Sequence, residues 1–270
     1  MAVDPAALLQ WYVAMGVDEA IGDAPVDRSI APPAPPARPG APSPTARGAP
    51  TPAPRPAAAP ARVAIAGAAD TRALAASCQT LAALEAAIRG FDGCALKATA
   101  TNTVFADGNP AAALMVVGEG PGAEEDRLGL PFVGASGRLL DRMLGAIGLE
   151  RRTGAHITNV VYWRPPGNRT PTPAELALCL PFVQRHIALA RPKVLVFSGA
   201  TAAKTLLERS DGITRFRGRW FDYRPGDVDF TIPVMPTFHP SYLLRTPGSK
   251  REAWRDFVAV KHRLGELGGL

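Results

Sequence analysis

The chain has 270 residues, of which 47% are hydrophobic, and a formal net charge of +6. This composition supports a folded core of one or two domains, and no apolar run is long enough to cross a bilayer. The first 16 residues carry an acid and a tryptophan where a signal peptide needs a basic start and an unbroken apolar segment. We therefore expect a cytoplasmic protein with no membrane contact, and the positive charge favours a polyanionic partner.

Three segments differ in composition along the chain. Residues 1–24 contain apolar positions at helical spacing and predict a short amphipathic helix. Residues 25–69 are rich in proline and alanine, and from residue 28 on they contain no acid, so they predict a basic, semi-extended linker. Residues 70–270 are expected to form the folded domain. Its three cysteines are too few for a disulfide framework and agree with a reducing compartment.

Strands and helices alternate through the last 200 residues. One helix is predicted at 70–89, another after Ser136 as its cap, and others at 174–189, 200–208 and 250–264. Core strands are predicted at 112–118, 156–162, 193–198 and 231–238. This alternation favours a three-layer α/β/α sandwich around a central, mainly parallel, four-stranded sheet.

A stretch of glycines, proline and acids follows the first predicted strand, from Gly118 to Asp126. Taken alone, these acids would form a solvated turn. The ring of Phe132 follows closely, on a loop whose glycines allow close approach to a ligand. Carboxylates beside an aromatic ring indicate a planar ligand that is attacked by water.

Polar residues end three of the four predicted strands. Glu119 and Glu125 follow the first strand, Asn159 lies in the second, and His239 follows the fourth. Because the carboxyl ends of parallel strands meet at one edge of the sheet, these side chains are expected to share a cleft. Each also has an ordinary explanation, since a strand asparagine or a single histidine is often a hydrogen-bonding residue of the fold.

Several motifs occur in an order that is typical of one enzyme family. These are GEGPGAEEDRLGLPFVG, TNVVYWRPPGNRTPTPAE, RGRW and TFHPSYLLR. From about Phe91 to the C-terminus, the chain resembles the family-four branch of the uracil-DNA glycosylase superfamily. The resemblance implies a monofunctional DNA-repair hydrolase that flips uracil out of DNA and leaves an abasic site.

The resemblance also implies roles for individual residues. Glu119 and Glu125 would hold or polarise the attacking water, and His239 would stabilise negative charge at uracil O2. The uracil itself would be bound by Gly118, Gly120, Phe132 and Asn159. The DNA would be contacted by Arg164, Ser241, Leu243, Leu244 and Arg245, with the two leucines as a wedge in the minor groove. By default, however, both leucines would be core residues.

The chemistry of glycosidic bond cleavage fits these residue types. Cleavage builds positive charge on the sugar and negative charge on the base, which carboxylates and a hydrogen-bond donor stabilise at opposite ends. An amide can accept from uracil N3–H and donate to O4, whereas cytosine presents the opposite pattern. Flipping the base leaves a gap in the stack that an apolar wedge can fill.

The chain departs from the family at its iron–sulfur ligands. The family holds a 4Fe–4S cluster with four cysteines, and here Cys94 and Cys179 match two of them while Phe91 and Trp163 replace the others. Two thiolates do not hold a cubane, so we expect no cofactor and an apolar plug in its place.

The leading hypothesis is a monomeric uracil-DNA glycosylase acting on uracil-containing DNA. One alternative is a non-catalytic protein of the same fold that binds damaged DNA. A nucleotide-phosphate hydrolase ranks last, because the glycine-rich turn lacks the lysine and Ser/Thr of a phosphate loop.

Overall fold

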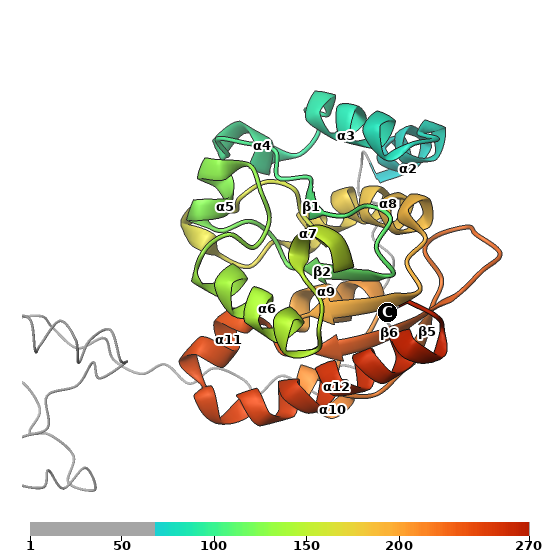
Figure 1. Cartoon of the computed structure of the whole chain (residues 1–270). Coiled ribbons are helices and arrows are strands. Elements are labelled where there is room, and N and C mark those ends of the chain that lie inside the picture. Colours follow the sequence, from blue (N-terminus) through green and yellow to red (C-terminus); the bar gives the residue numbers. More distant parts are fainter. Residues whose placement is uncertain (1–67, 270) are drawn as a thin grey trace, which may run out of the picture. The chain divides into compact units, whose positions relative to one another are not determined.

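The computed structural model describes residues 68–269 (Figure 1). The predicted N-terminal helix and nearly all of the linker lie outside this range. The division of the chain at residues 24 and 69 therefore stays a prediction.

The described residues form a sheet of six strands in the order β1-β3-β2-β4-β6-β5. Their bounds are β1 Ala106–Gly108, β2 Leu114–Gly118, β3 Ala155–Asn159, β4 Val194–Ser198, β5 Phe221–Tyr223 and β6 Ile232–Thr237. The four central strands are parallel, and Val116 of β2 pairs with Ile157 on one side and Val196 on the other. The two outer strands, β1 and β5, pair antiparallel. The predicted parallel sheet is confirmed, and the short edge strands extend it.

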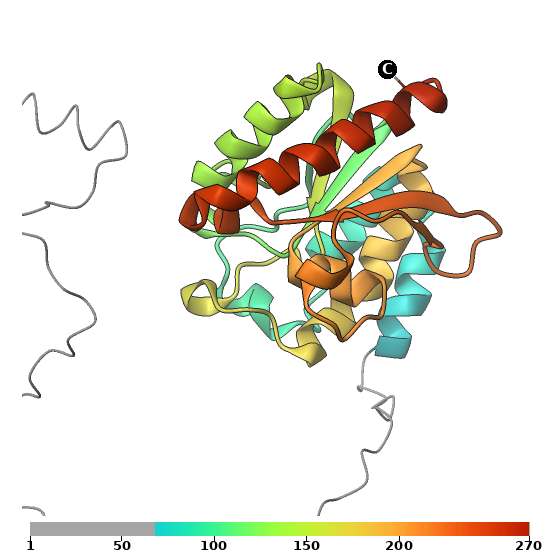
Figure 2. The same cartoon turned by 90° about the horizontal axis from the view of Figure 1, so that it is seen from below.

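Helices cover both faces of the sheet, as Figure 2 shows. Helices α6 (Ala135–Ala146) and α12 (Lys250–Glu266) pack on one face, where Leu140, Leu144 and Phe257 meet the sheet. Helices α8 (Pro173–Ala190) and α9 (Ala200–Leu206) cover the other. Strands β2, β3 and β4 are buried throughout, which fits the nearly continuous apolar sequences of β2 and β4, whereas β3 also buries the polar residues His156, Thr158 and Asn159. The three-layer α/β/α fold is therefore confirmed.

The remaining helices are short or lie at the periphery. They are α2 Ala68–Ser77, α3 Leu81–Gly90, α4 Ala95–Thr99, α5 Ala123–Leu128, α7 Arg151–Gly154, α10 Ile213–Phe216 and α11 Pro240–Arg245, with single 3-10 turns at Pro166–Asn168 and Pro247–Ser249. Among residues 68–269, no helix is long and apolar enough to span a membrane.

Three local predictions were wrong. The helix predicted at 70–89 is two helices, because the Thr80 side chain accepts a hydrogen bond from the Ala83 amide and caps a new helix. Helix α6 begins after Gly134 rather than at Ser136. The predicted strand at 156–162 ends at Asn159. The chain therefore leaves the sheet at the residue whose polar side chain faces the carboxyl edge.

Candidate active site

A cavity of about 600 Å³ opens at the carboxyl edge of the sheet. Residues from four separate segments line it, namely Glu119 after β2, Phe132 before α6, Asn159 at the end of β3 and His239 after β6. The parallel arrangement brings these segments together, because all four central strands end at the same edge. The cleft expected from the sequence is therefore present and includes every predicted catalytic residue.

Phe132 forms one wall of the cavity in an unusual backbone conformation. Its φ is +53°, in the left-handed region that non-glycine residues rarely adopt, and it is 4% exposed. Its ring centroid lies 5.3 Å from that of His239. A Cβ at Gly118 would lie 2.5 Å from the ring and 2.4 Å from Asn159 Oδ1. The absence of a side chain at Gly118 therefore leaves the space between these groups open.

Asn159 presents a buried polar group to the cavity. The residue is 1% exposed, and its Oδ1 has no hydrogen-bond partner among the described residues. A buried acceptor without a partner is costly and marks a position where a ligand can supply the missing donor. The amide is therefore poised to bind a group with an N–H.

His239 is a partly exposed residue whose ring orientation is fixed by its own helix. Its Nδ1 accepts a hydrogen bond from the Ser241 amide at 3.1 Å and lies 2.8 Å from Ser241 Oγ. Burial, the largest cause, and the charge of Arg245 together lower the pKa of His239 to about 4 against the opposing effect of Glu125. The imidazole is therefore neutral at pH 7, with its proton on Nε2, where it can act as a donor.

The two candidate carboxylates have different surroundings. Glu125 Oε1 accepts from the amides of Val133 and Gly134 at 3.0 and 2.9 Å, and its Oε2 accepts from the Gly122 amide at 3.1 Å. Glu119 lines the same cavity, and its carboxylate makes no hydrogen bond or ion pair within the described part of the chain. Glu119 is thus free to bind water, whereas Glu125 is engaged by the loop that carries Phe132.

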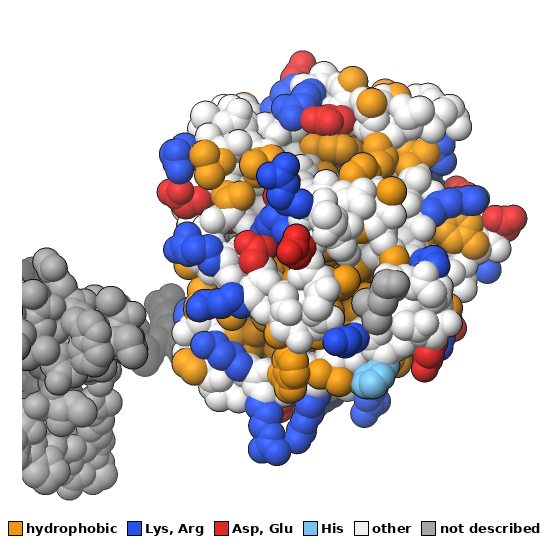
Figure 3. All heavy atoms as spheres, viewed as in Figure 1, with side chains coloured by type: hydrophobic (Ala, Val, Ile, Leu, Met, Phe, Trp, Pro, Cys, Tyr) orange, Lys and Arg blue, Asp and Glu red, His pale blue; other side chains and the backbone are white. Residues whose placement is uncertain are grey.

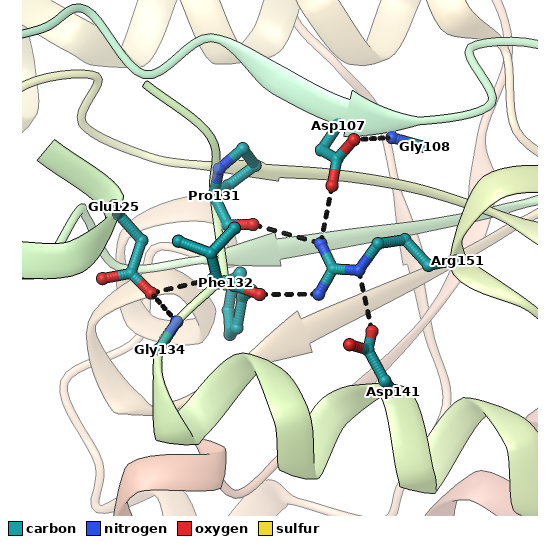
Figure 4. Close-up of polar contacts among 9 residues, drawn as sticks. Asp107, Gly108, Glu125, Pro131, Phe132, Gly134, Asp141 and Arg151 are labelled. Atoms are coloured by element: carbon teal, nitrogen blue, oxygen red, sulfur yellow. Dashed lines mark hydrogen bonds and ion pairs between the residues drawn. The ribbon is translucent and has the colours of Figure 1, made fainter. Parts of the chain in front are cut away.

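Arg151, which was not predicted as a site residue, binds the Phe132 loop on the side opposite Glu125. Arg151 Nη2 donates to the Phe132 carbonyl at 2.6 Å, and its Nη1 donates to the Pro131 carbonyl at 3.1 Å (Figure 4). Gly137 permits the tight turn, because a Cβ there would lie 1.7 Å from the Phe132 oxygen. Arg151 lies outside the family motifs, so its role could not be predicted from the sequence.

Four of the five predicted DNA-contact residues, Ser241, Leu243, Leu244 and Arg245, lie on α11. Leu244 is 39% exposed, whereas Leu243 is 1% exposed and packs with Phe238 and Ala253. The segment expected to be a loop is a helix, and its core packing leaves Leu244 as the exposed one of the two leucines predicted to form the wedge. Ser241 hydrogen-bonds with His239 instead of projecting outward.

The two arginines among the predicted DNA contacts have different surroundings. Arg245 lines the cavity, while Arg164 lies outside the cavity lining and donates to Asn168 Oδ1 at 2.7 Å. Figure 3 shows Lys and Arg side chains gathered at the edge formed by α11 and α12. Arg217, of the RGRW motif, is instead paired with the buried Asp256, which also accepts from Thr237 Oγ1 at 2.6 Å. Arg217 therefore supports the end of β6 rather than a phosphate.

The four residues at the cluster positions implied by the resemblance, Phe91, Cys94, Trp163 and Cys179, pack in one apolar cluster. The interaction between the two buried thiols lowers the pKa of Cys94 and raises that of Cys179. The Phe91 ring lies 6.4 Å from Trp163, whose indole donates to Thr103 at 3.0 Å. Within residues 68–269, no group of three or more Cys, His, Asp or Glu side chains could hold a metal ion. The residues present therefore do not fit a four-cysteine cluster.

Comparison with known proteins decides the family. Residues 105–258, which include the whole candidate site, match the model of the uracil DNA glycosylase superfamily. The chain belongs to the uracil-DNA glycosylase superfamily. The resemblance drawn from the motifs is thereby confirmed, together with the fold that it implied.

Several similar proteins are named type-4 uracil-DNA glycosylase. The chain is 46% identical over 153 residues to the one from Thermotoga maritima, covering 56% of this chain and 77% of the relative. It is 37% identical over 175 residues to the one from Pyrobaculum aerophilum, with 63% and 88% covered. The relative from Archaeoglobus fulgidus is 39% identical over 180 residues, with 65% and 87% covered.

Proposed function

We propose that this protein hydrolyses the N-glycosidic bond of uracil in DNA and leaves an abasic site. One observation carries the proposal: the partner-free amide oxygen of Asn159 faces the same cavity as the Phe132 ring, the neutral imidazole of His239 and the free carboxylate of Glu119. Superfamily membership and relatives named as type-4 uracil-DNA glycosylases support the same activity.

Base recognition would use the ring and the amide. Uracil extruded from the helix would stack on Phe132, which is available because Gly118 has no side chain. Asn159 Oδ1 would accept from uracil N3–H, and its amide nitrogen would donate to O4. Cytosine has an acceptor at N3 and a donor at C4, so it would meet unmatched groups and be rejected.

Bond cleavage would separate two charges that the cavity stabilises at its two sides. The C1′–N1 bond breaks with its electron pair moving into the uracil ring, where the Nε2–H of His239 donates to O2. A water held by Glu119 supplies the oxygen that bonds to C1′; one of its protons stays on the new C1′ hydroxyl, and the other is released to solvent, from which the departing base is protonated. Glu125 would act through the loop, by holding the backbone that presents Phe132.

An assay on a labelled oligonucleotide tests this function. An end-labelled strand with one uracil is incubated with the protein and treated with alkali, which breaks DNA at abasic sites. We expect a break at the uracil position, and none at cytosine in the matched strand. Binding without a break under every salt and strand condition would favour the non-catalytic alternative.

We also propose that the protein acts without an iron–sulfur cluster, as a monomer in the cytoplasm. The aromatic side chains of Phe91 and Trp163 at two ligand positions support the first part. Purified protein is expected to be colourless and free of stoichiometric iron. A brown protein with an absorption shoulder in the visible range and bound iron would overturn the proposal.

A further inference from the structure

The loop that carries Phe132 is held from two sides by opposite charges. Glu125, on α5, accepts from the amides of Val133 and Gly134. Arg151, on α7, donates to the carbonyls of Pro131 and Phe132. Figure 4 shows Pro131, Phe132 and Gly134 between the side chains of Glu125 and Arg151. All the hydrogen bonds from these two side chains to residues 131–134 are made to backbone atoms. Glu125 and Arg151 thus form a clamp that fixes the path of the loop backbone, whatever side chains the loop carries.

Arg151 is itself held in place by two carboxylates. Its Nη1 lies 2.9 Å from Asp107 Oδ2 on β1, and its Nε lies 2.7 Å from Asp141 Oδ1 on α6. The Arg151 side chain is mostly buried, with the guanidinium spanning β1, α6 and the loop. A planar guanidinium with several fixed donors suits this task, and lysine could not make the same set of bonds.

The clamp acts on a cavity residue whose backbone is strained, as is that of Asn168 elsewhere in the lining. Phe132 has φ of +53°, a conformation that persists only where the surroundings enforce it. The Phe132 carbonyl also lies against Gly137, where a Cβ would be only 1.7 Å away. Without the bonds from Arg151, the peptide would relax toward an ordinary conformation, and the ring would leave its place beside Gly118 and His239.

We propose that Arg151 is a positioning residue for base recognition: with Glu125 it clamps the 131–134 backbone and thereby aims the Phe132 ring into the cavity. This proposal rests on the proposed function for the role of Phe132. Arg151 touches neither base nor sugar and acts only through the loop. Its loss should impair the chemical step and uracil binding while leaving contact with the DNA backbone intact.

The test compares Arg151→Gln with Arg152→Gln. Arg152 is the next residue on α7, is exposed, and makes no hydrogen bond or ion pair within residues 68–269. Both variants lose one positive charge, so their difference reports the clamp. We expect Arg151→Gln to lower the single-turnover excision rate roughly 10- to 100-fold, as misplacement of a positioning group does. Its affinity for abasic-site DNA should change less than about threefold, and Arg152→Gln should resemble the wild type.

A double-mutant cycle separates positioning from general destabilisation. In a Phe132→Leu background the ring is gone, so adding Arg151→Gln should lower the rate less than about threefold further. If the two losses multiply, Arg151 does not act through Phe132 and the proposal is overturned. Should Arg151→Gln fail to fold, Arg151→Lys serves instead, with a smaller loss in the wild-type background and the same non-additivity.

Hydrogen exchange tests the clamp independently of activity. The amides of Val133 and Gly134 should exchange at least about tenfold faster in Arg151→Gln than in Arg152→Gln. Unchanged exchange would overturn the clamp even if activity fell. If the wild type releases no uracil, the proposed function fails, while faster exchange would still establish the clamp as a feature of the loop.

Discussion

Gly118 determines whether the cavity can admit a planar ligand. A Cβ at this position would meet both Asn159 Oδ1 and the Phe132 ring at about 2.5 Å or less. Gly118→Ala should therefore lower uracil excision roughly 100-fold, because side chains that define the site must move. Single-turnover assays check this, with Gly145→Ala on α6 as the matched control, since a Cβ at Gly145 meets nothing within 4 Å. Equal activity of the two variants would contradict this account.

The two carboxylates should respond differently to the same amide substitution. Glu119→Gln should reduce the excision rate by about 100-fold, as loss of a water-orienting base does, with little change in melting temperature. Glu125→Gln should lower the melting temperature as well. In the wild type a backbone N–H donates to each carboxylate oxygen, and the side-chain NH2 of glutamine would face one of these donors without being able to accept its hydrogen bond. Thermal melts and single-turnover rates of both variants measure the difference. A Glu119→Gln variant with a wild-type rate would remove Glu119 from the chemistry.

At the level of residues, the sequence indicated which side chains meet but not how each is used. Glu119, Asn159 and His239 could be predicted because they follow buried strands that end at one edge. The engagement of Glu125 by three amides and the clamp by Arg151 depend on loop geometry, which has no sequence signal. Leu243 and Leu244 are chemically alike, and only the packing of α11 separates the buried one from the exposed one.

A pair of buried histidines joins β3 to α8 and makes stability depend on pH. His156 Nε2 lies 2.8 Å from His186 Nε2, and the His186 ring stacks on Phe105. Burial lowers the pKa of His156 to about 4; burial and the neighbouring His156 also lower that of His186. Both rings are therefore neutral in the folded protein at pH 7.

These shifts predict loss of stability in acid. The unfolded chain binds protons below its histidine pKa of about 6.5, and the folded chain does not until about pH 4. The stabilisation is thus complete above about pH 6.5 and is lost as the pH falls toward 4, by on the order of 3 kcal/mol for His156. Urea unfolding at several pH values measures this. A His186→Gln variant with the same acid sensitivity as the wild type would contradict the assignment.

The aromatic cluster of Phe91, Tyr162 and Trp163 should contribute strongly to the stability of the fold. Trp163 is fully buried beside Tyr162 and Phe91. Trp163→Ala should lower the free energy of unfolding by about 3–5 kcal/mol, whereas Trp254→Ala, at a site 47% exposed, should cost far less. Chemical denaturation measures both variants. A chelator should leave the wild-type melting temperature unchanged, and a marked drop would indicate a bound metal.

At the level of elements, long apolar strands were predictable and short ones were not. Strands β2 and β4 are continuous apolar runs buried on both faces, so their sequences identify them. Strands β1 and β5 have three residues each and are specified by pairing with their neighbours rather than by their own sequence. The break near Thr80 was missed because the apolar pattern continues across it.

At the level of the whole molecule, the fold brings distant residues to one edge of the sheet. The parallel order β3-β2-β4-β6 places around one cavity the ends of the three strands that finish in polar residues. Gly199 leaves space for His239, since a Cβ at Gly199 would lie 2.9 Å from the His239 Cβ. This convergence followed from the alternation of strands and helices. The shape of the cavity did not, because it depends on glycines whose missing side chains leave space.

The central claim is that this cavity receives one flipped uracil. A crystal structure of the Glu119→Gln variant with a uracil-containing oligonucleotide tests it most directly. We predict uracil stacked on Phe132, with N3 and O4 within about 3.2 Å of the Asn159 amide and O2 near His239 Nε2. A uracil that remains stacked in the DNA, or that binds with Asn159 Oδ1 still lacking a partner, would contradict the account.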